Sequence, residues 1–260
     1  MFPYKDDNPT LATPVVTLAI IAVNVVAWLA LQRGGVEPGL ARSFCELGLI
    51  PGELLGRVPQ GTLVPLGPHL ECEIGAPAPH TVLTSMFLHG SWFHLLGNMW
   101  FLWIFGNNVE DSMGRGRFVA FYLLCGVLAA VGHIALQPGS AIPMVGASGA
   151  ISGVMGAYLV LYPRVRVHML LFIVIFITTF TVPAYVMLFY WLFLQVLGGA
   201  TAIGAEGGGV AFAAHLGGFV AGAALIKLFA RRDLVEAHRR HVHNLERRVV
   251  FRDFGRDRWM

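Results

Sequence analysis

Charged residues are scarce in this chain of 260 residues. Asp, Glu, Lys and Arg make up only 13% of it, whereas 56% is hydrophobic and the mean hydropathy is +0.66. In soluble domains about a quarter of the residues are charged. The composition therefore excludes an ordinary cytosolic enzyme, a disordered protein and a nucleic-acid-binding domain, and it predicts an integral membrane protein.

Cysteine is also rare, with three residues in the chain. Cys45 and Cys72 belong to one loop and could pair if that loop faces an oxidising space, whereas Cys125 lies in an apolar run and is expected to be a packing residue. The polar start of the chain lacks the basic region and cleavage site of a secretory signal. We therefore expect the first apolar segment to be a retained helix.

Long stretches of the chain contain no Asp, Glu, Lys or Arg, and Pro and Gly divide them further. A helix that spans a bilayer needs about 20 mostly apolar residues. We therefore predict one all-α membrane domain at 14–230 with six helices. Several of these helices are short, which implies tilt or local thinning of the bilayer. They are expected at 14–31, 91–106, 118–137, 147–162, 183–198 and 212–230.

The basic residues predict the sidedness, because they concentrate in cytoplasmic loops. Six crossings with residues 1–13 as a short cytoplasmic N-terminus place 15 of the 18 Lys and Arg residues inside. The outer loop at 32–80 then carries the other three together with five glutamates. The segment 231–260 is predicted to be a basic cytoplasmic tail. Its nine basic residues are accompanied by five acids, so it is not read as a nucleic-acid arm.

One stretch admits two readings. The segment 168–198 is apolar enough for two passes, with Pro183 as a divider, but two passes would move the basic tail outside. We therefore interpret 168–182 as an interfacial or partly embedded segment and 183–198 as a single crossing. The Gly-rich segment 198–211 is expected to be a mobile loop that covers a cavity as a lid.

Polar groups inside a membrane are costly and are therefore functional candidates. Ser148 opens a predicted helix within Gly-Ala-Ser-Gly, and His215 lies near the start of the last predicted helix. Either residue alone is more simply a packing or capping residue. However, each of the two helices carries a strip of small residues, formed by Gly149 and Gly153 in one and by Gly218 and Gly222 in the other. Such strips allow the two helices to pack backbone to backbone. In the six-helix topology both candidates then lie near the outer ends of their helices.

A second cluster lies at the start of the helix expected at 91–106. His94 and Asn98 are four residues apart, so a helix places them on one face. Both can donate hydrogen bonds, which suits them to stabilise an oxyanion. A zinc site is the competing interpretation of the histidines, but no H-E-x-x-H motif and no neighbouring acid support it. We therefore expect no metal and no cofactor.

Taken together, the chain resembles the rhomboid family of intramembrane serine proteases. The resemblance rests on four ordered motifs within about residues 80–230. These are H-G-S-x-x-H-L-x-x-N-M at 89–99, E-x-x-x-G at 110–114, G-A-S-G at 146–149 and A-H-x-G-G at 214–218. The family's six-helix core, with its serine on the fourth helix and its histidine on the sixth, agrees with the predicted spans.

The resemblance implies the roles of the site residues. Ser148 would be the nucleophile and His215 the general base, and together they would form a dyad that cleaves transmembrane protein substrates. The backbone N–H of Ser148 and the side chains of Asn98 and His94 would form the oxyanion hole. Glu110 would hold its loop in place on the cytoplasmic side. A multi-pass protein of the cell membrane is expected, with both termini cytoplasmic and the active site open to the outer side.

The chain departs from the family in several ways. Four residues after the nucleophile some members carry an aromatic ring that packs on the catalytic histidine, whereas Ser152 stands here, so the group that orients His215 is not identified. The first outer loop contains no Trp-Arg pair of the kind that some members carry, and we expect no N-terminal cytoplasmic domain. The six-helix core of the family also does not explain the apolar segment 168–182. Two alternatives remain, namely a non-catalytic rhomboid-like protein that binds membrane clients and a small channel or transporter that uses its histidines as an ion path.

Overall fold

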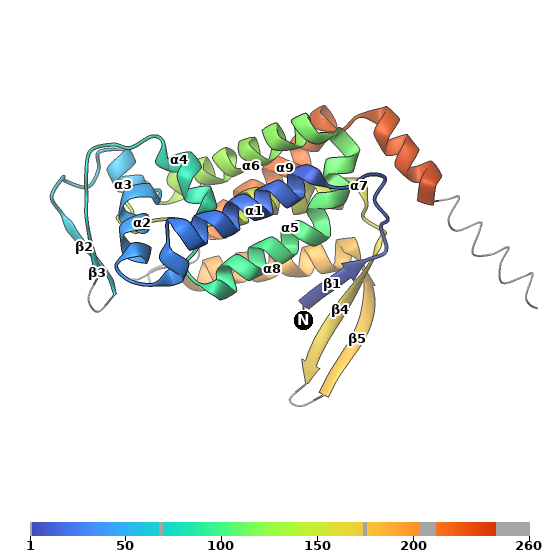
Figure 1. Cartoon of the computed structure of the whole chain (residues 1–260), viewed down its shortest axis with the longest axis horizontal. Coiled ribbons are helices and arrows are strands. Elements are labelled where there is room, and N and C mark those ends of the chain that lie inside the picture. Colours follow the sequence, from blue (N-terminus) through green and yellow to red (C-terminus); the bar gives the residue numbers. More distant parts are fainter. Residues whose placement is uncertain (1, 68–69, 174–175, 203–211, 243–260) are drawn as a thin grey trace, which may run out of the picture.

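The computed structural model describes residues 2–67, 70–173, 176–202 and 212–242, and this part of the chain is mostly helical. Six of its helices coincide with the six predicted ones and form an elongated bundle (Figure 1). The second of these six helices, predicted at 91–106, continues further than predicted, to Met113. The six are α1 (Val15–Ala30), α5 (Trp92–Met113), α6 (Arg115–Leu136), α7 (Ser148–Leu161), α8 (Ala184–Ala202) and α9 (Phe212–Phe229).

Two of these helices, α6 and α9, are long and apolar enough to cross a membrane by length and composition. The apolar helices α1, α7 and Ala184–Gly198 are shorter. Large apolar side chains are exposed on the outside of the bundle, which a soluble monomer rarely tolerates over a large patch. On α8 and α1 they include Tyr185, Phe189, Phe193, Leu197, Val23, Val26 and Leu29.

The helices α7 and α9 approach so closely that only glycine fits between them. A Cβ atom added to Gly222 would overlap the carbonyl oxygen of Gly153, and one added to Gly218 would overlap the carbonyl oxygen of Gly149. The two predicted glycine strips therefore face each other. Small residues permit this kind of backbone contact between membrane helices.

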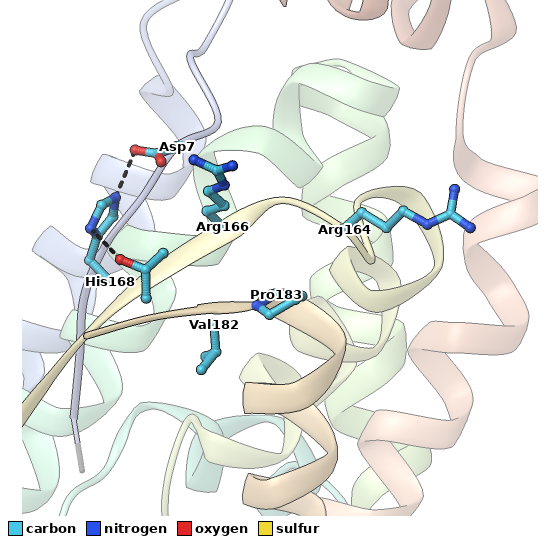
Figure 2. A pocket seen from close by; sticks show the side chains of 7 residues that line it. Asp7, Arg164, Arg166, His168, Val182 and Pro183 are labelled. Carbon is cyan, nitrogen blue, oxygen red and sulfur yellow. Dashed lines mark hydrogen bonds and ion pairs between the residues drawn. The ribbon is translucent and has the colours of Figure 1, made fainter.

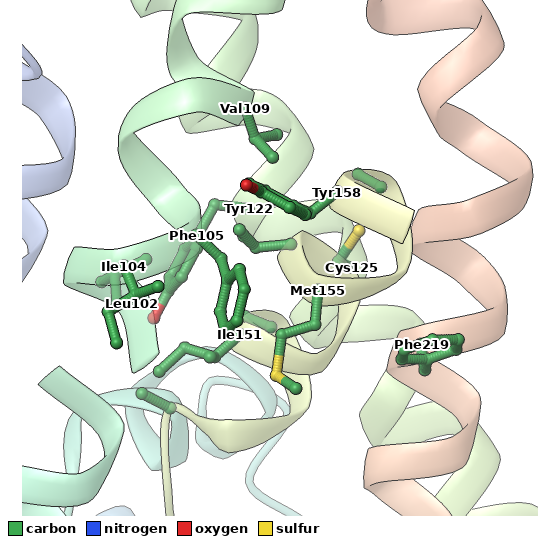
Figure 3. Packing of buried hydrophobic residues seen from close by; sticks show 14 of the residues in the cluster. Leu102, Ile104, Phe105, Val109, Tyr122, Cys125, Ile151, Met155, Tyr158 and Phe219 are labelled. Atoms are coloured by element: carbon green, nitrogen blue, oxygen red, sulfur yellow. The ribbon is translucent and has the colours of Figure 1, made fainter. Parts of the chain in front are cut away.

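The core lies between α5, α6, α7 and α9 (Figure 3). Phe105 packs edge to face against Tyr158 with ring centroids 4.9 Å apart, and Cys125 is a buried free thiol, as the sequence predicted. Cys125 also lies against the glycine face of α7, because a Cβ atom added to Gly153 would lie only 2.5 Å from the Cβ atom of Cys125. The buried core thus continues up to the α7–α9 contact.

The helix α1 begins at a carboxylate that belongs to α5. Its N-terminus has no side-chain cap of its own. Glu110 accepts hydrogen bonds from the backbone N–H groups of Val16 (3.0 Å) and Thr17 (2.8 Å) and from the Thr17 hydroxyl (2.8 Å). A negative charge at this end also interacts favourably with the helix dipole. Glu110 therefore joins α1 to α5, rather than acting only on its own loop as the resemblance implied.

At one end of the bundle the predicted outer loop is folded. It contains α2 (Gly39–Leu47), α3 (Pro51–Leu54) and a hairpin of β2 (Leu63–Gly67) and β3 (Leu70–Glu73), followed by the short turns α4 (Thr81–Thr84) and η2 (Ser85–Phe87). A further short turn, η1 (Arg33–Gly35), follows α1. Cys45 and Cys72 form a disulfide that ties α2 to β3. The pairing left conditional by the sequence is thus present.

At the other end, the segment expected to be interfacial is a β-hairpin. The strands β4 (Arg166–Ile173) and β5 (Phe176–Pro183) are antiparallel, and β1 (Phe2–Asp6) pairs with β4 on its other side (Figure 1). The expectation of an all-α protein is therefore wrong for these segments. The physical reason is composition, since Val, Ile, Thr and Phe dominate 167–182 and favour extended backbone.

Polar contacts attach the N-terminal strand to the bundle. The Tyr158 hydroxyl donates a hydrogen bond to Asp6, and Asn8 donates to the Tyr158 oxygen (3.2 Å). Burial raises the pKa of the Asp6 carboxyl to about 6. Asn108 of α5 donates to the carbonyl of Asn8 (3.0 Å). The predicted short N-terminus is consequently part of the folded protein.

Two further expectations concern the later part of the chain. Of the segment 198–211, which was predicted to be a lid loop, residues 198–202 belong to the end of α8, and residues 203–211 lie outside the described part. Residues 232–242 of the tail are helical, and His238 is buried there and lies 3.0 Å from the carbonyl oxygen of Pro9. Burial lowers the pKa of His238. Residues 243–260 lie outside the described part.

The α7–α9 contact predicts a position-dependent effect of added methyl groups. Gly222→Ala should lower the free energy of unfolding by about 1–3 kcal/mol, because overpacking forces the helices apart. Gly116→Ala is the matched control, because nothing lies within 4 Å of a Cβ atom there. Thermal unfolding in detergent should show a lower midpoint for the first variant and an unchanged or higher one for the second. Equal midpoints for Gly222→Ala and wild type would contradict the close contact.

Candidate active site

The serine and histidine candidates meet where α7 and α9 are in contact. The Oγ atom of Ser148 lies 2.6 Å from Nε2 of His215, although the residues are 67 positions apart in the chain. His215 is 9% exposed. Ser148 is the first residue of α7, so its backbone N–H has no partner within the helix and lies at the positive end of the helix dipole. The carbonyl oxygen of an acyl group at this hydroxyl would therefore lie beside an N–H donor that the helix leaves unpaired.

His94 is fixed by the start of α5. Ser91 is the N-cap residue, and its Oγ accepts a hydrogen bond from the backbone N–H of His94 (3.1 Å). In return, Nδ1 of His94 accepts from the backbone N–H of Gly90 (3.2 Å), in a variant of the capping box. Since Nδ1 is an acceptor, the proton of the neutral ring is on Nε2. The histidine therefore presents a donor at Nε2.

The loop before α5 is held by a side-chain amide from the end of α1. Gln32 donates to the carbonyl oxygen of His89 (2.8 Å) and accepts from the N–H of the same residue (2.8 Å). His89 in turn packs edge to face against His94, with ring centroids 5.1 Å apart. The position of His94 thus depends on contacts on both sides of the helix start.

Asn98 follows one turn later on α5 and is 8% exposed. Its Nδ2 group is buried and has no hydrogen-bond partner among the described residues. Buried polar groups without a partner are uncommon and call for a functional explanation. Asn98 and His94 thus each offer a donor group. No group of three or more His, Cys, Asp or Glu side chains suited to a metal ion occurs in the described part of the chain.

Gly146 lies between the two halves of the site. A Cβ atom at this position would lie 3.0 Å from Nε2 of His94 and 3.4 Å from Oγ of Ser148. Its φ of +134° is also a conformation that L-residues rarely adopt. The glycine therefore keeps the space between the histidine donor and the serine hydroxyl open.

The residues that contact the far side of His215 were missed by the sequence analysis. Nδ1 of His215 lies 2.7 Å from Oε1 of Gln195, and the Trp191 ring lies against the imidazole with centroids 5.9 Å apart. Both residues belong to α8. Ser152, which replaces the aromatic ring of some family members, donates instead to the carbonyl of Ser148 (2.6 Å). The signal for Gln195 was available, since it is the only Gln or Asn within the apolar α8.

A separate cavity of about 350 Å³ lies at the β-hairpin end of the bundle (Figure 2). Arg164, Arg166 and His168 are among its lining residues. His168 bridges Asp7 (2.8 Å) and Thr181 (3.3 Å). This cavity contains none of the four predicted site residues.

The comparisons with known proteins support a relation to the rhomboid family. The Rhomboid domain model matches residues 77–232. "Presenilin-associated rhomboid-like protein, mitochondrial" of Mus musculus is 36% identical over 105 residues, which are 40% of this chain and 26% of that protein. "Rhomboid protease GluP" of Bacillus subtilis is 40% identical over 78 residues, which are 30% of this chain and 15% of that protein.

A third relative gives the longest of these three alignments. "Rhomboid protein 1, mitochondrial" of Saccharomyces cerevisiae is 30% identical over 146 residues, or 55% of this chain and 39% of the yeast protein. The alignments to the mammalian relatives cover only about a quarter of the length of those proteins. The family match, by contrast, covers more than half of this chain and includes all four predicted site residues. The chain therefore belongs to the rhomboid family of membrane proteins.

Proposed function

We propose that the chain is an intramembrane serine endopeptidase that cleaves transmembrane segments of membrane proteins. One observation carries the proposal, namely the distance of 2.6 Å between Oγ of Ser148 and Nε2 of His215. A nucleophile within hydrogen-bonding distance of a base is the signature of an activated serine. Ser148 is the nucleophile and His215 the general base.

The reaction proceeds through an acyl-enzyme. Oγ of Ser148 attacks the scissile carbonyl carbon while Nε2 of His215 takes its proton, which gives a tetrahedral oxyanion. The C–N bond then breaks as the imidazolium returns the proton to the leaving amine. Water, activated by the same nitrogen, hydrolyses the resulting ester and frees Ser148. No carboxylate partner of His215 is needed for these steps, so the pair acts as a dyad.

Three donors stabilise the oxyanion in this proposal. They are the backbone N–H of Ser148, the side-chain amide of Asn98 and Nε2 of His94. The unpartnered Nδ2 of Asn98 and the tautomer assigned to His94 support these roles. Pre-organised donors of this kind lower the barrier because they need no reorganisation when the charge develops.

The membrane setting is part of the proposal. Six helices cross the bilayer within the domain at 14–230, residues 1–13 and the tail at 231–260 are cytoplasmic, and the site opens to the outer side of a cell membrane. The excess of basic residues on the proposed inner side supports this orientation. The disulfide between Cys45 and Cys72 also supports it, since disulfides persist in oxidising compartments. The substrates are transmembrane proteins, and no cofactor or metal takes part.

A non-catalytic rhomboid protein that binds membrane clients is the second candidate. The names of the mammalian relatives do not include the word protease, whereas the name of the Bacillus relative does. The presence of both Ser148 and His215 at hydrogen-bonding distance favours the protease. A client-binding protein would have no need for this geometry.

Labelling with a fluorophosphonate probe tests the proposed function without knowledge of the substrate. Purified wild-type protein in detergent should be labelled, because the activated Oγ attacks the probe phosphorus. Ser148→Ala and His215→Ala should not be labelled, while both should unfold cooperatively on heating. Equal labelling of Ser148→Ala and wild type, or no labelling of a folded wild type, would contradict the proposal.

Asn98→Ala should slow the labelling reaction by about 10²–10³-fold, the usual effect of removing one oxyanion donor. The matched control is Asn107→Ala, an Asn near the other end of the same helix, which should react at the wild-type rate. Rate constants measured at several probe concentrations check this prediction. An Asn98→Ala rate equal to that of the control would exclude the oxyanion role.

Gly146→Ala should impair the reaction through geometry. The added Cβ atom would push Nε2 of His94 aside by a few tenths of an ångström and would strain the backbone, whose φ of +134° L-residues rarely adopt. Because reaction rates are sensitive to small misplacements of catalytic groups, we expect the labelling rate to fall several-fold. Gly139→Ala in the same loop is the control, because nothing lies within 4 Å of a Cβ atom there and its φ is not positive. Similar labelling rates for the two variants would refute the assigned spacing.

A further inference from the structure

Both ring nitrogens of His215 have a partner, and the two contacts together define its tautomer. A general base must have an unprotonated Nε2 toward Ser148, so the neutral ring carries its proton on Nδ1. That proton requires an acceptor, and Oε1 of Gln195 lies 2.7 Å away. The hydroxyl of Ser148 donates to Nε2, and Nδ1–H donates to Gln195. A continuous Ser–His–Gln chain of hydrogen bonds results.

The environment explains why the acceptor is an amide. His215 is buried, and α8 between Ala184 and Ala202 contains no charged residue. An isolated carboxylate would be expensive to bury at this place. A neutral amide oxygen can still accept the Nδ1 proton and orient the ring, but without this cost. The hydrogen bond from Nδ1 to the Gln195 oxygen fixes which ring nitrogen of His215 is protonated, as the hydrogen bonds of histidines do in general.

The Trp191 ring restricts the same imidazole from a second direction. It lies 5.9 Å from the centre of the His215 ring and 6.1 Å from that of Phe219, one turn further along α9. Trp191 and Gln195 are four residues apart on α8, so both lie on the same face of that helix. One face of α8 thus supplies both a packing surface and a hydrogen-bond acceptor for the base.

We propose that Gln195 is a positioning residue of the catalytic dyad, which holds His215 in the Nδ1–H tautomer and orients its Nε2 toward Ser148. This assignment rests on the proposed protease function. Gln195 does not touch the reacting atoms. Its contribution is therefore expected in the bond-forming step of the reaction and in the pH dependence of that step, but not in the binding of a probe.

The test uses inactivation by a fluorophosphonate probe, analysed for the maximal rate k(inact) and the half-saturating concentration K(I). Gln195→Leu removes the acceptor but keeps a side chain of similar size. We expect k(inact) to fall about tenfold, the rate equivalent of one hydrogen bond, with K(I) unchanged. Val196→Leu is the matched control, since Val196 is the next residue on α8 and is 52% exposed. It should match wild type in both constants.

Gln195→Glu distinguishes an acceptor role from a packing role. The carboxylate restores an acceptor, so k(inact) should return to near the wild-type value. It also favours the charged imidazolium, so the acid limb of the pH profile of inactivation should move to higher pH, by about one unit or more. If Gln195 only packed against His215, Gln195→Glu would neither restore k(inact) nor shift the pH profile.

Three results would overturn the assignment. They are a Gln195→Leu variant with wild-type k(inact), a Gln195→Leu variant altered in K(I) alone, and a Gln195→Glu variant as slow as Gln195→Leu with an unshifted pH profile. Failure of the proposed function has a different signature, since wild type itself would then show no labelling that depends on Ser148. The two failures are therefore distinguishable in a single set of measurements.

Discussion

The close contact between α7 and α9 is the constraint on which the site depends. Carbonyl oxygens of Gly149 and Gly153 occupy the space that a side chain on Gly218 or Gly222 would need. Only this backbone-to-backbone packing brings a residue at the start of α7 within 2.6 Å of a side chain on α9. Membrane helices gain little from the hydrophobic effect when they associate, so such packing of small residues is a main source of their affinity. The same glycines therefore stabilise the bundle and set the distance between Ser148 and His215.

The remaining site residues are placed by hydrogen bonds at helix ends. Ser91 caps α5 and so fixes the backbone of His94, whose ring returns a contact to the preceding glycine. Glu110 at the far end of α5 caps α1. Each of these polar groups has its partner within the protein. Asn98 differs from them, because its buried Nδ2 has no partner among the described residues, and the same is true of both ring nitrogens of His89.

The sequence predicted those parts of the structure that follow from a pattern within one segment of the chain. Apolar runs identified the six helices, and the glycine spacing identified the faces that bring Ser148 and His215 together. The hairpin of β4 and β5 was not predicted, because an apolar run rich in Val, Ile and Phe is compatible with a strand as well as with a membrane segment. The contact of Gln195 with His215 was missed for a different reason. This contact joins two helices, and no spacing rule along one chain segment reveals which side chains face each other across such a gap.

The orientation of His215, the proposed base, depends on α8, the helix that carries many exposed apolar side chains. Phe189, Phe193 and Leu197 of α8 are each at least half exposed, whereas Trp191 and Gln195 on the same helix contact His215. The face of α8 that carries Trp191 and Gln195 thus contacts the candidate site at His215. A displacement of α8 would remove the ring contact and the hydrogen bond together. The alignment of His215 toward Ser148 is consequently coupled to the position of α8, whereas the α7–α9 spacing is set by contacts of glycine backbone.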